Sequence, residues 1–505
     1  MIPNPRNLPS VVFGNGRPSV DSDEWWVQKL SSAIRYRNES PDWNRARLDN
    51  PHGTRPGLLL LDSWLRGEPP LPVSAADSYV DAWSAFLRLS RTNYAELITS
   101  SRTERIVPLG WRTAVEEADD TDGDEEAERF ATHTNLRNRI SEAVQDMCGL
   151  GVGYLLVGRD TLGGGDGKRA LVTRESPLAT MVAEDAANRP RAGLRMLHDP
   201  WTDTYEAWLY RVVNGKGYQR VARRDSRTGW AWDDRYSHPL PDFPLVPLHN
   251  YLGIGEFERH LDALTRINDT MFTRLVLTKL QAHRQRALET EVPKENDKYE
   301  IDAEVDPADF DTGPDALWHL PPGVRLWESS QADLTHVRLM VEDDVKAAAA
   351  VTKTPVWQLL PGSQNQSATG SERAHEGFLA MVEDRRHRVD VALARVLAMG
   401  FAIQGDTARA NAERISTIWA PTERYGLIEK SQAFSAMYGK WPFDELAVDV
   451  MQKRPSELQR LNAARAKDTF YNPVVANSVA PQQDSSTSQQ PQQPMLPLEA
   501  GSDDA

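Results

Sequence analysis

Apolar residues recur every three or four positions in two stretches between residues 333 and 400, and a polar segment separates the two stretches. This spacing predicts two helices, each with one buried face. The apolar positions are Leu334, Val337, Val341, Val345 and Ala348, then Phe378, Val382, Val389, Leu393 and Val396. Pro355 ends the first helix because proline lacks a backbone N–H, and Gly400 is expected to cap the second. The segment 361–368 is too polar to pack a core.

A different pattern runs from residue 154 to about residue 247, where β-branched and aromatic residues alternate with polar ones between turn residues. It predicts several antiparallel strands. The expected strands are 154–157, 170–173, 193–197, 204–213, 217–222 and 229–232. Asn214 and Gly215 are the dipeptide that a tight hairpin prefers. The prolines at positions 239, 241, 244 and 247 predict a stiff extended connector.

Helical spacing also predicts helices over residues 75–98 and from Phe257 to about Thr290. Two acidic stretches, 116–128 and 291–315, are expected to be a solvated loop and an irregular charged excursion. Beyond Gly400, the expected elements are a strand at 415–419 and helices at 430–438, 443–451 and 455–466. The tail from about residue 473 is rich in Asn, Ser, Gln and Pro, which predicts disorder.

Composition narrows the class of protein. The 505 residues are too many for one core, and the formal net charge of −15 lacks the basic footprint of a tight DNA-binding protein. The single cysteine, Cys148, has apolar neighbours and is expected to be a buried thiol. No apolar run is long enough to predict a membrane span or a signal peptide.

Two segments carry a resemblance to a known family. Residues 354–360, the polar loop and the helix after it resemble the tunnel-loop region of tailed-phage portal proteins, especially siphophage portals of actinobacteriophages. Residues 419–422, 431–438, 441–443 and 456–458 are similar to that family's C-terminal Trp-Pro strand and short crown helices. The family usually reads Ser-Gly-Glu-Ala after the loop, whereas this chain has Gly370-Ser371-Glu372-Arg373-Ala374.

The resemblance implies an α+β subunit with a wing, a stem of long helices, a clip, a tunnel loop and a helical crown. The implied segments are an N-terminal arm (1–50), the first part of the wing (51–253), the first stem helix (254–290), the clip (291–330), the second stem helix (331–355), the tunnel loop (356–370), a long helix with the second part of the wing (371–438), the crown (439–472) and a disordered tail (473–505).

The resemblance also implies a function. Portal subunits form a ring, twelve-fold in the virion, at one capsid vertex, through which the terminase motor packages double-stranded DNA. The ring then retains the genome and releases it through the tail. The implied partners are other copies of the chain, double-stranded DNA, the terminase large subunit, the major capsid protein, the scaffold and a head–tail adaptor. The implied locations are the virion and, during assembly, the host cytoplasm.

Three groups of site residues follow from this resemblance. The uncharged loop is expected to touch DNA at the narrowest level of the channel, and two lysines could face it. Acidic residues of the clip are expected to contact terminase and the adaptor. In this order the residues are Gly362, Ser363, Gln364, Asn365, Gln366 and Ser367; Lys346 and Lys353; and Asp302, Glu304, Asp306, Asp309 and Asp311.

No catalytic constellation is evident, so we expect neither an enzyme nor a metal or other cofactor. The glycine-rich segment 163–169 lacks the residues of a phosphate loop. His387 could be an acid–base group and Asp343 with Asp344 could hold a metal, but solvated or intersubunit charge pairs are the preferred interpretation. Two alternative classes remain: another multimeric virion protein, such as an adaptor or a capsid-associated protein, and a nucleic-acid-processing enzyme.

Overall fold

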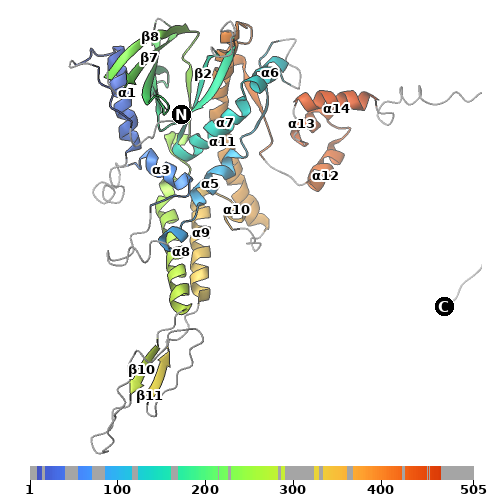
Figure 1. Ribbon diagram of the computed structural model, residues 1–505. Coiled ribbons are helices and arrows are strands. Elements are labelled where there is room, and N and C mark those ends of the chain that lie inside the picture. Colours follow the sequence, from blue (N-terminus) through green and yellow to red (C-terminus); the bar gives the residue numbers. More distant parts are fainter. Residues whose placement is uncertain are drawn as a thin grey trace, which may run out of the picture.

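The computed structural model describes most of the chain, with gaps. The described ranges are 8–13, 17–39, 55–70, 86–115, 123–160, 169–213, 215–225, 229–282, 286–290, 324–328, 334–360, 368–422, 427–451, 453 and 455–467. Helices and strands are mixed, which confirms the α+β class. The sheets lie in a body at one end, and a pair of helices projects from it (Figure 1).

The largest sheet has five antiparallel strands in sequence order. They are β4 (Thr180–Glu184), β5 (Pro190–Asp199), β6 (Thr204–Val213), β7 (Lys216–Asp225) and β8 (Gly229–Leu240). Val213 pairs with Lys216, so the turn has two residues, as the Asn-Gly pattern predicts. Helix α1 (Asp23–Asn38) covers one face of this sheet, with Trp26 and Ile34 buried against it. Part of the predicted arm therefore belongs to the core of the body.

A second sheet has three antiparallel strands in the order β3-β2-β9. They are β2 (Val152–Arg159), β3 (Ala170–Glu175) and β9 (Leu245–His249), and α7 (Leu136–Leu150) packs on them. The predicted proline connector is wrong, because Pro239 lies in β8 and Pro247 in β9. Both strands are at sheet edges, where a residue without an N–H is tolerated.

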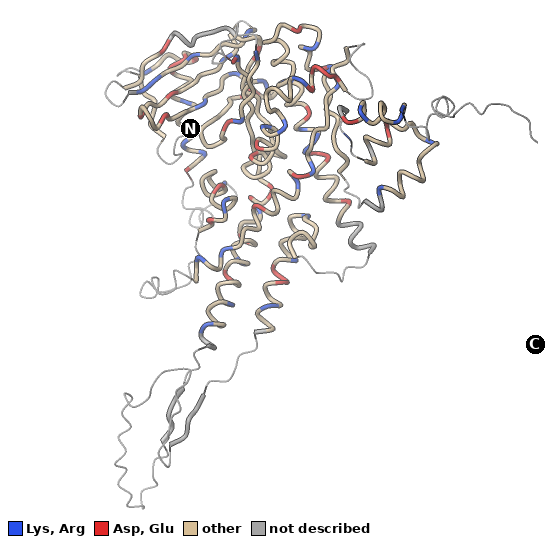
Figure 2. Tube along the Cα trace, turned by 45° about the vertical axis from the view of Figure 1, so that its right-hand side comes forward, with Lys and Arg blue, Asp and Glu red and all other residues tan. Residues whose placement is uncertain are grey.

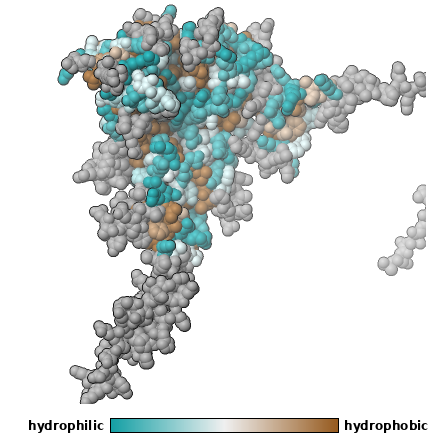
Figure 3. All heavy atoms as spheres, viewed as in Figure 1, coloured by the Kyte–Doolittle hydropathy of each residue, from teal (hydrophilic) through white to brown (hydrophobic). Residues whose placement is uncertain are grey.

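Helices α8 (Leu261–Ala282) and α9 (Leu334–Thr352) run side by side away from the body. The helix predicted to reach Thr290 stops at Ala282, because Arg286–Thr290 forms strand β10, which pairs with β11 (Val324–Glu328). A partner more than 30 residues away along the chain decided this strand, and local periodicity cannot reveal such a partner. Lysine, arginine and acidic residues alternate along α8 and α9, and apolar side chains lie among them on the surface (Figures 2 and 3).

After α9, the short helix α10 (Val356–Leu359) precedes α11 (Ala368–Gln404). Gly400 does not end α11, contrary to the prediction; the left-handed residue is Gly405, with φ of +86°. A Cβ at Gly400 would lie 2.3 Å from the ring of Phe130, so this glycine allows close packing between α11 and α6. Helix α11 also packs on β2 and β9 within the main core.

The remaining elements complete the body and a separate small group of helices. In the body they are α3 (Leu58–Leu65), α5 (Tyr94–Thr103), β1 (Pro108–Arg112), α6 (Glu125–His133), the 3₁₀ turns Tyr251–Gly253, Glu258–His260 and Ala412–Arg414, and β12 (Ser416–Trp419). Helices α12 (Leu427–Met437), α13 (Phe443–Asp449) and α14 (Pro455–Lys467) lie beside the body (Figure 1).

Two further predictions need correction. The helix expected over residues 75–98 is interrupted, because residues 91–93 are not helical and the Asn93 side chain caps α5 by accepting from the backbone N–H of Glu96. The acidic stretch 116–128 is not wholly a solvated loop, since Asp124 is buried and residues from Glu125 onward are helical. Among the described helices, none is both long enough and apolar enough to span a membrane.

Candidate functional site

The corner after α9 directs the chain toward the predicted tunnel loop. Helix α9 ends at Thr352, and Lys353 has a left-handed backbone, with φ of +52°. Thr354 is buried, and Pro355 precedes α10. A left-handed lysine costs roughly 1–3 kcal/mol, so its surroundings must hold it in place.

Arg102, in α5, binds the residues on both sides of Lys353. Its side chain is fully buried, and its guanidinium donates to the carbonyl oxygen of Thr352 and to Thr354 Oγ1, the latter at 3.3 Å. It also donates to the carbonyl of Ile98 at 2.6 Å and lies 5.6 Å from the ring centroid of Phe378 in α11. Burial lowers the pKa of Arg102. The corner is therefore fixed by one cation that reaches it from another helix.

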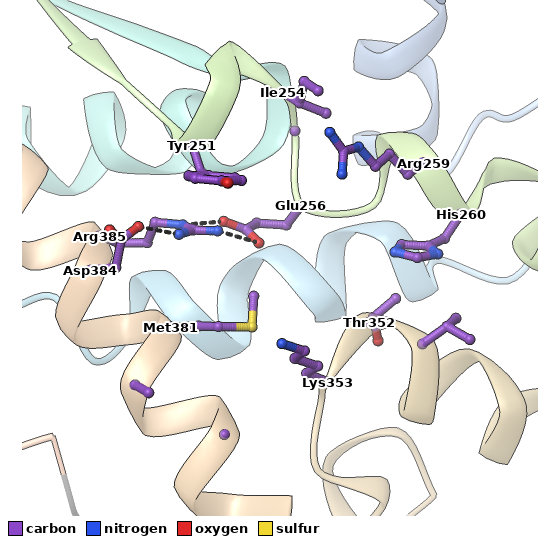
Figure 4. A pocket seen from close by; sticks show the side chains of 14 residues that line it. Tyr251, Ile254, Glu256, Arg259, His260, Thr352, Lys353, Met381, Asp384 and Arg385 are labelled. Atoms are coloured by element: carbon purple, nitrogen blue, oxygen red, sulfur yellow. Dashed lines mark hydrogen bonds and ion pairs between the residues drawn. The ribbon is translucent and has the colours of Figure 1, made fainter. Parts of the chain in front are cut away.

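Glu256 extends this contact to α11. Its carboxylate lies 3.3 Å from Arg102 Nε and accepts from Arg385 Nε at 2.7 Å, and its side chain is 3% exposed (Figure 4). Burial lowers the pKa of Arg385, but the hydrogen bonds and charge of Glu256 outweigh burial and raise it overall. We name Arg102, Glu256 and Arg385 the corner network. The corner network joins three parts of the chain near the end of α9. They are α5, which contains Arg102, the segment before α8, which contains Glu256, and α11, which contains Arg385.

Cys148 is buried next to this network, as the sequence predicts. Burial, together with the nearby carboxylate of Glu256, raises the pKa of its thiol. The thiolate is the reactive form of cysteine, so this residue is chemically inert in the folded chain.

The two predicted channel lysines are described, and both are exposed. Lys346 lies in α9, with its Nζ atom 3.4 Å from Asp343, and Lys353 lies at the corner. The predicted loop and clip contacts fall outside the described residues, so their roles stay predictions: Gly362 to Ser367, and Asp302, Glu304, Asp306, Asp309 and Asp311.

Among the described residues, Asp344 is part of an ion pair and His387 lies on the surface of a helix. Asp344 binds Arg266 at 2.8 Å and accepts from Thr270 Oγ1 at 2.9 Å, so it links α9 to α8. His387 is exposed on α11. Within the described residues, no group of three or more histidines, cysteines or carboxylates could hold a metal ion.

No pattern in the sequence indicates the corner network. Its three members stand at positions 102, 256 and 385, in different segments, and each resembles an ordinary surface charge. Only their burial in the folded chain distinguishes them.

Residues 84–282 match the family described as "Phage portal protein, SPP1 Gp6-like". No curated protein matches. Among solved structures, a chain of "Neck of native GTA particle computed with C12 symmetry" aligns with a TM-score of 0.37 and 13% identity, over 78% of this chain and 98% of that chain.

The matched segment runs from just before α5 to the end of α8, and it includes both larger sheets and two members of the corner network, Arg102 and Glu256. This segment, about two fifths of the chain, therefore matches the same phage portal protein family that the sequence resembles.

Proposed function

We propose that this chain is the portal subunit of a tailed phage. Copies of it form a ring at one capsid vertex, and double-stranded DNA passes through the hole. The family match supports the portal role, and it supports a structural rather than an enzymatic protein. The proposed partners are terminase, the capsid protein with its scaffold, and a head–tail adaptor.

The observation that carries the proposal beyond the family match is the anchored corner. Helix α9 ends against a buried arginine, and α11 is tied to the same arginine through Glu256. Eight residues lie between α10 and the start of α11, and the chain on both sides of them is therefore held by the corner network. Their sequence, Leu360-Pro361-Gly362-Ser363-Gln364-Asn365-Gln366-Ser367, has no charge. Such a segment suits weak, sequence-independent contact with a sliding duplex, because charged rings would hold the phosphates.

A cross-linking experiment tests this proposal. Cysteine replaces Gln364 or Gln366, and each variant is packaged with DNA that carries a thiol-reactive cross-linker on its backbone. Cys148 is buried with a raised thiol pKa, so the introduced thiol is the reactive one. We expect a DNA adduct at one or both positions.

The control variant is Trp201→Cys, because Trp201 is 88% exposed at the turn between β5 and β6, on the large sheet. It should give no adduct. Equal adducts at all three positions, or none at Gln364 and Gln366, would overturn the loop's proposed role. Negative-stain images of the purified chain provide a second test, in which rings with a central hole support the portal and compact monomers contradict it.

A further inference from the structure

A pocket of about 590 Å³ opens beside the corner network. The segment 251–260 forms one wall, the end of α9 forms another, and α11 forms the third (Figure 4). Tyr251, Arg259, His260, Lys353, Met381 and Arg385 are among its lining residues. Figure 4 shows the Lys353 side chain reaching into it from below and Arg259 lying across from it.

The charges of this pocket do not balance. Its two carboxylates are already paired: Glu256 binds Arg385 at 2.7 Å, and Asp384 accepts from Arg388 at 2.9 Å. Among the residues that the structure describes, none forms an ion pair or hydrogen bond with the side chain of Arg259 or of Lys353. Burial and the charges of Arg102 and Arg259 lower the pKa of His260, so that imidazole is neutral at pH 7. The pocket therefore presents two uncompensated cations in a chain whose net charge is −15.

Lys353 is held toward the pocket at a cost. Its left-handed backbone is fixed on both sides, because Arg102 binds the carbonyl of Thr352 and the hydroxyl of Thr354. Strain of this kind persists where the surroundings impose it, and it is common at ligand-binding positions. The corner network thus fixes the position of the lysine's backbone.

The rim of the pocket is apolar. Tyr251 and Val351 both line it and are 50% and 52% exposed, and Leu252, next along the chain, is 64% exposed. Exposed apolar residues gathered around a recess mark a protein-contact surface more often than a nucleic-acid one. Protein–DNA interfaces are more polar and more positively charged than protein–protein interfaces, so this apolar rim favours a protein as the occupant.

We propose that this pocket receives a carboxylate-bearing side chain from a second copy of the chain, with the apolar rim packed against the residues that flank that carboxylate. The inference rests on the proposed ring, and it names a contact that would hold neighbouring copies together. Charge complementarity supports a second copy as the occupant, since Asp and Glu outnumber Lys and Arg in this chain by 73 to 58. Each pocket would tie one copy to the next, close to the start of the loop.

Zero-length cross-linking tests the contact directly. A carbodiimide joins the amine of Lys353 to a carboxylate in contact with it, forming an amide with loss of water. Rings are assembled from an equal mixture of ¹⁴N- and ¹⁵N-labelled full-length chain, cross-linked, digested and analysed by mass spectrometry. We expect a mixed-isotope peptide pair that joins Lys353 to an Asp or Glu of the second copy. A Lys353 link found only within one copy overturns the proposal.

Charge variants provide the second measurement. Lys353→Glu or Arg259→Glu should raise the dissociation constant between copies at least about tenfold, because each places a carboxylate opposite a carboxylate. Lys353→Arg keeps the charge, so it should keep assembly while losing the carbodiimide product. Lys216→Glu is the matched control, because Lys216 is exposed at the start of β7 and does not line the pocket.

The outcomes separate this inference from the proposed function. If all variants form normal rings and Lys353 gives no intercopy product, the pocket contact is wrong and the portal proposal stands. If the charge variants assemble normally but bind duplex DNA less tightly than wild type in a titration, the pocket takes DNA phosphate instead. If the wild-type chain forms no ring, both proposals fail.

Discussion

At the scale of single residues, the decisive groups are buried charges. Arg102, Glu256 and Arg385 are almost fully removed from water, so Glu256 compensates both arginines, and Arg385 also pairs with the partly exposed Asp384. Breaking a buried pair by removing one partner costs more than the pair contributes, because the charge left behind has no water to solvate it. The corner network is therefore sensitive to the loss of its single carboxylate.

We predict that Glu256→Gln lowers the free energy of unfolding by about 3–5 kcal/mol, since it leaves the buried guanidinium of Arg102 without its anion and leaves Arg385 with only the partly exposed Asp384. Chemical denaturation followed by circular dichroism measures the change. Glu413→Gln is the control, because Glu413 is exposed, and its effect should stay within about 0.5 kcal/mol. Equal small effects for both variants would contradict the role given to Glu256.

Asp124 supports a pH prediction. Burial raises its pKa, but hydrogen bonds from Thr113, Arg409 and the backbone N–H of Glu126 outweigh burial and lower it overall. A carboxyl with a lowered folded-state pKa adds stability at pH values above its unfolded pKa of about 3.9, and that stability is lost as the pH falls through the folded-state value.

The Asp124→Asn variant isolates this effect. Asparagine still caps α6, as the aspartate does by accepting from Glu126 N–H at 2.8 Å, but it cannot ionise. We expect the free energy of unfolding of wild type to fall below about pH 4, while that of the variant changes less. The difference in free energy of unfolding between the two proteins should therefore become smaller in acid. Chemical denaturation at a series of pH values measures this difference in free energy of unfolding. A difference that is the same at pH 3 and pH 7 would contradict the prediction.

At the scale of elements, two glycines in α11 have opposite roles. A Cβ at Gly400 would lie 2.3 Å from the Phe130 ring, whereas a Cβ at Gly377 would meet nothing within 4 Å. Glycine within a helix costs about 0.5–1 kcal/mol relative to alanine, and an overpacked core costs typically 1–3 kcal/mol. Replacing Gly400 by alanine should therefore lower the stability of the fold, because packing dominates at that position. Replacing Gly377 by alanine should raise it, because helix propensity dominates there.

We predict that Gly400→Ala destabilises the chain by about 1–3 kcal/mol and that Gly377→Ala stabilises it by about 0.5–1 kcal/mol. Thermal melting of the two variants beside wild type measures both. Adding Phe130→Leu to Gly400→Ala should recover part of the loss, because the smaller side chain makes room for the methyl group. If both alanine variants are stabilised, the close approach of α6 and α11 does not exist.

The elements also show what the sequence could reveal. Strand β6 has the predicted bounds, and the turn into β7 has the predicted length, because alternation and the Asn-Gly dipeptide are local signals. The end of α8 and the role of Gly400 were missed because distant partners decide them: strand β11 in one case and Phe130 in the other. The corner network was missed for the same reason, since burial is a property of the fold.

At the scale of the whole molecule, α8 and α9 carry the chain away from the body to β10 and β11 (Figure 1). Residues 291–323, which join those two strands, include the acidic positions assigned to the clip. We predict that replacing Asp302, Asp306 and Asp309 by lysine abolishes terminase docking while rings still assemble. Pull-down with terminase large subunit and negative-stain imaging measure the two properties. Loss of rings would mean that this segment lies between copies.

Strands β1 and β12 pair although they lie some 300 residues apart, with Trp111 opposite Thr417. Residues 113–415, which include the projecting helices α8 and α9, thus form one long insertion between two strands that pair with each other. A load applied to the projecting helices would therefore reach the rest of the chain through a segment whose two ends are held together by this strand pair.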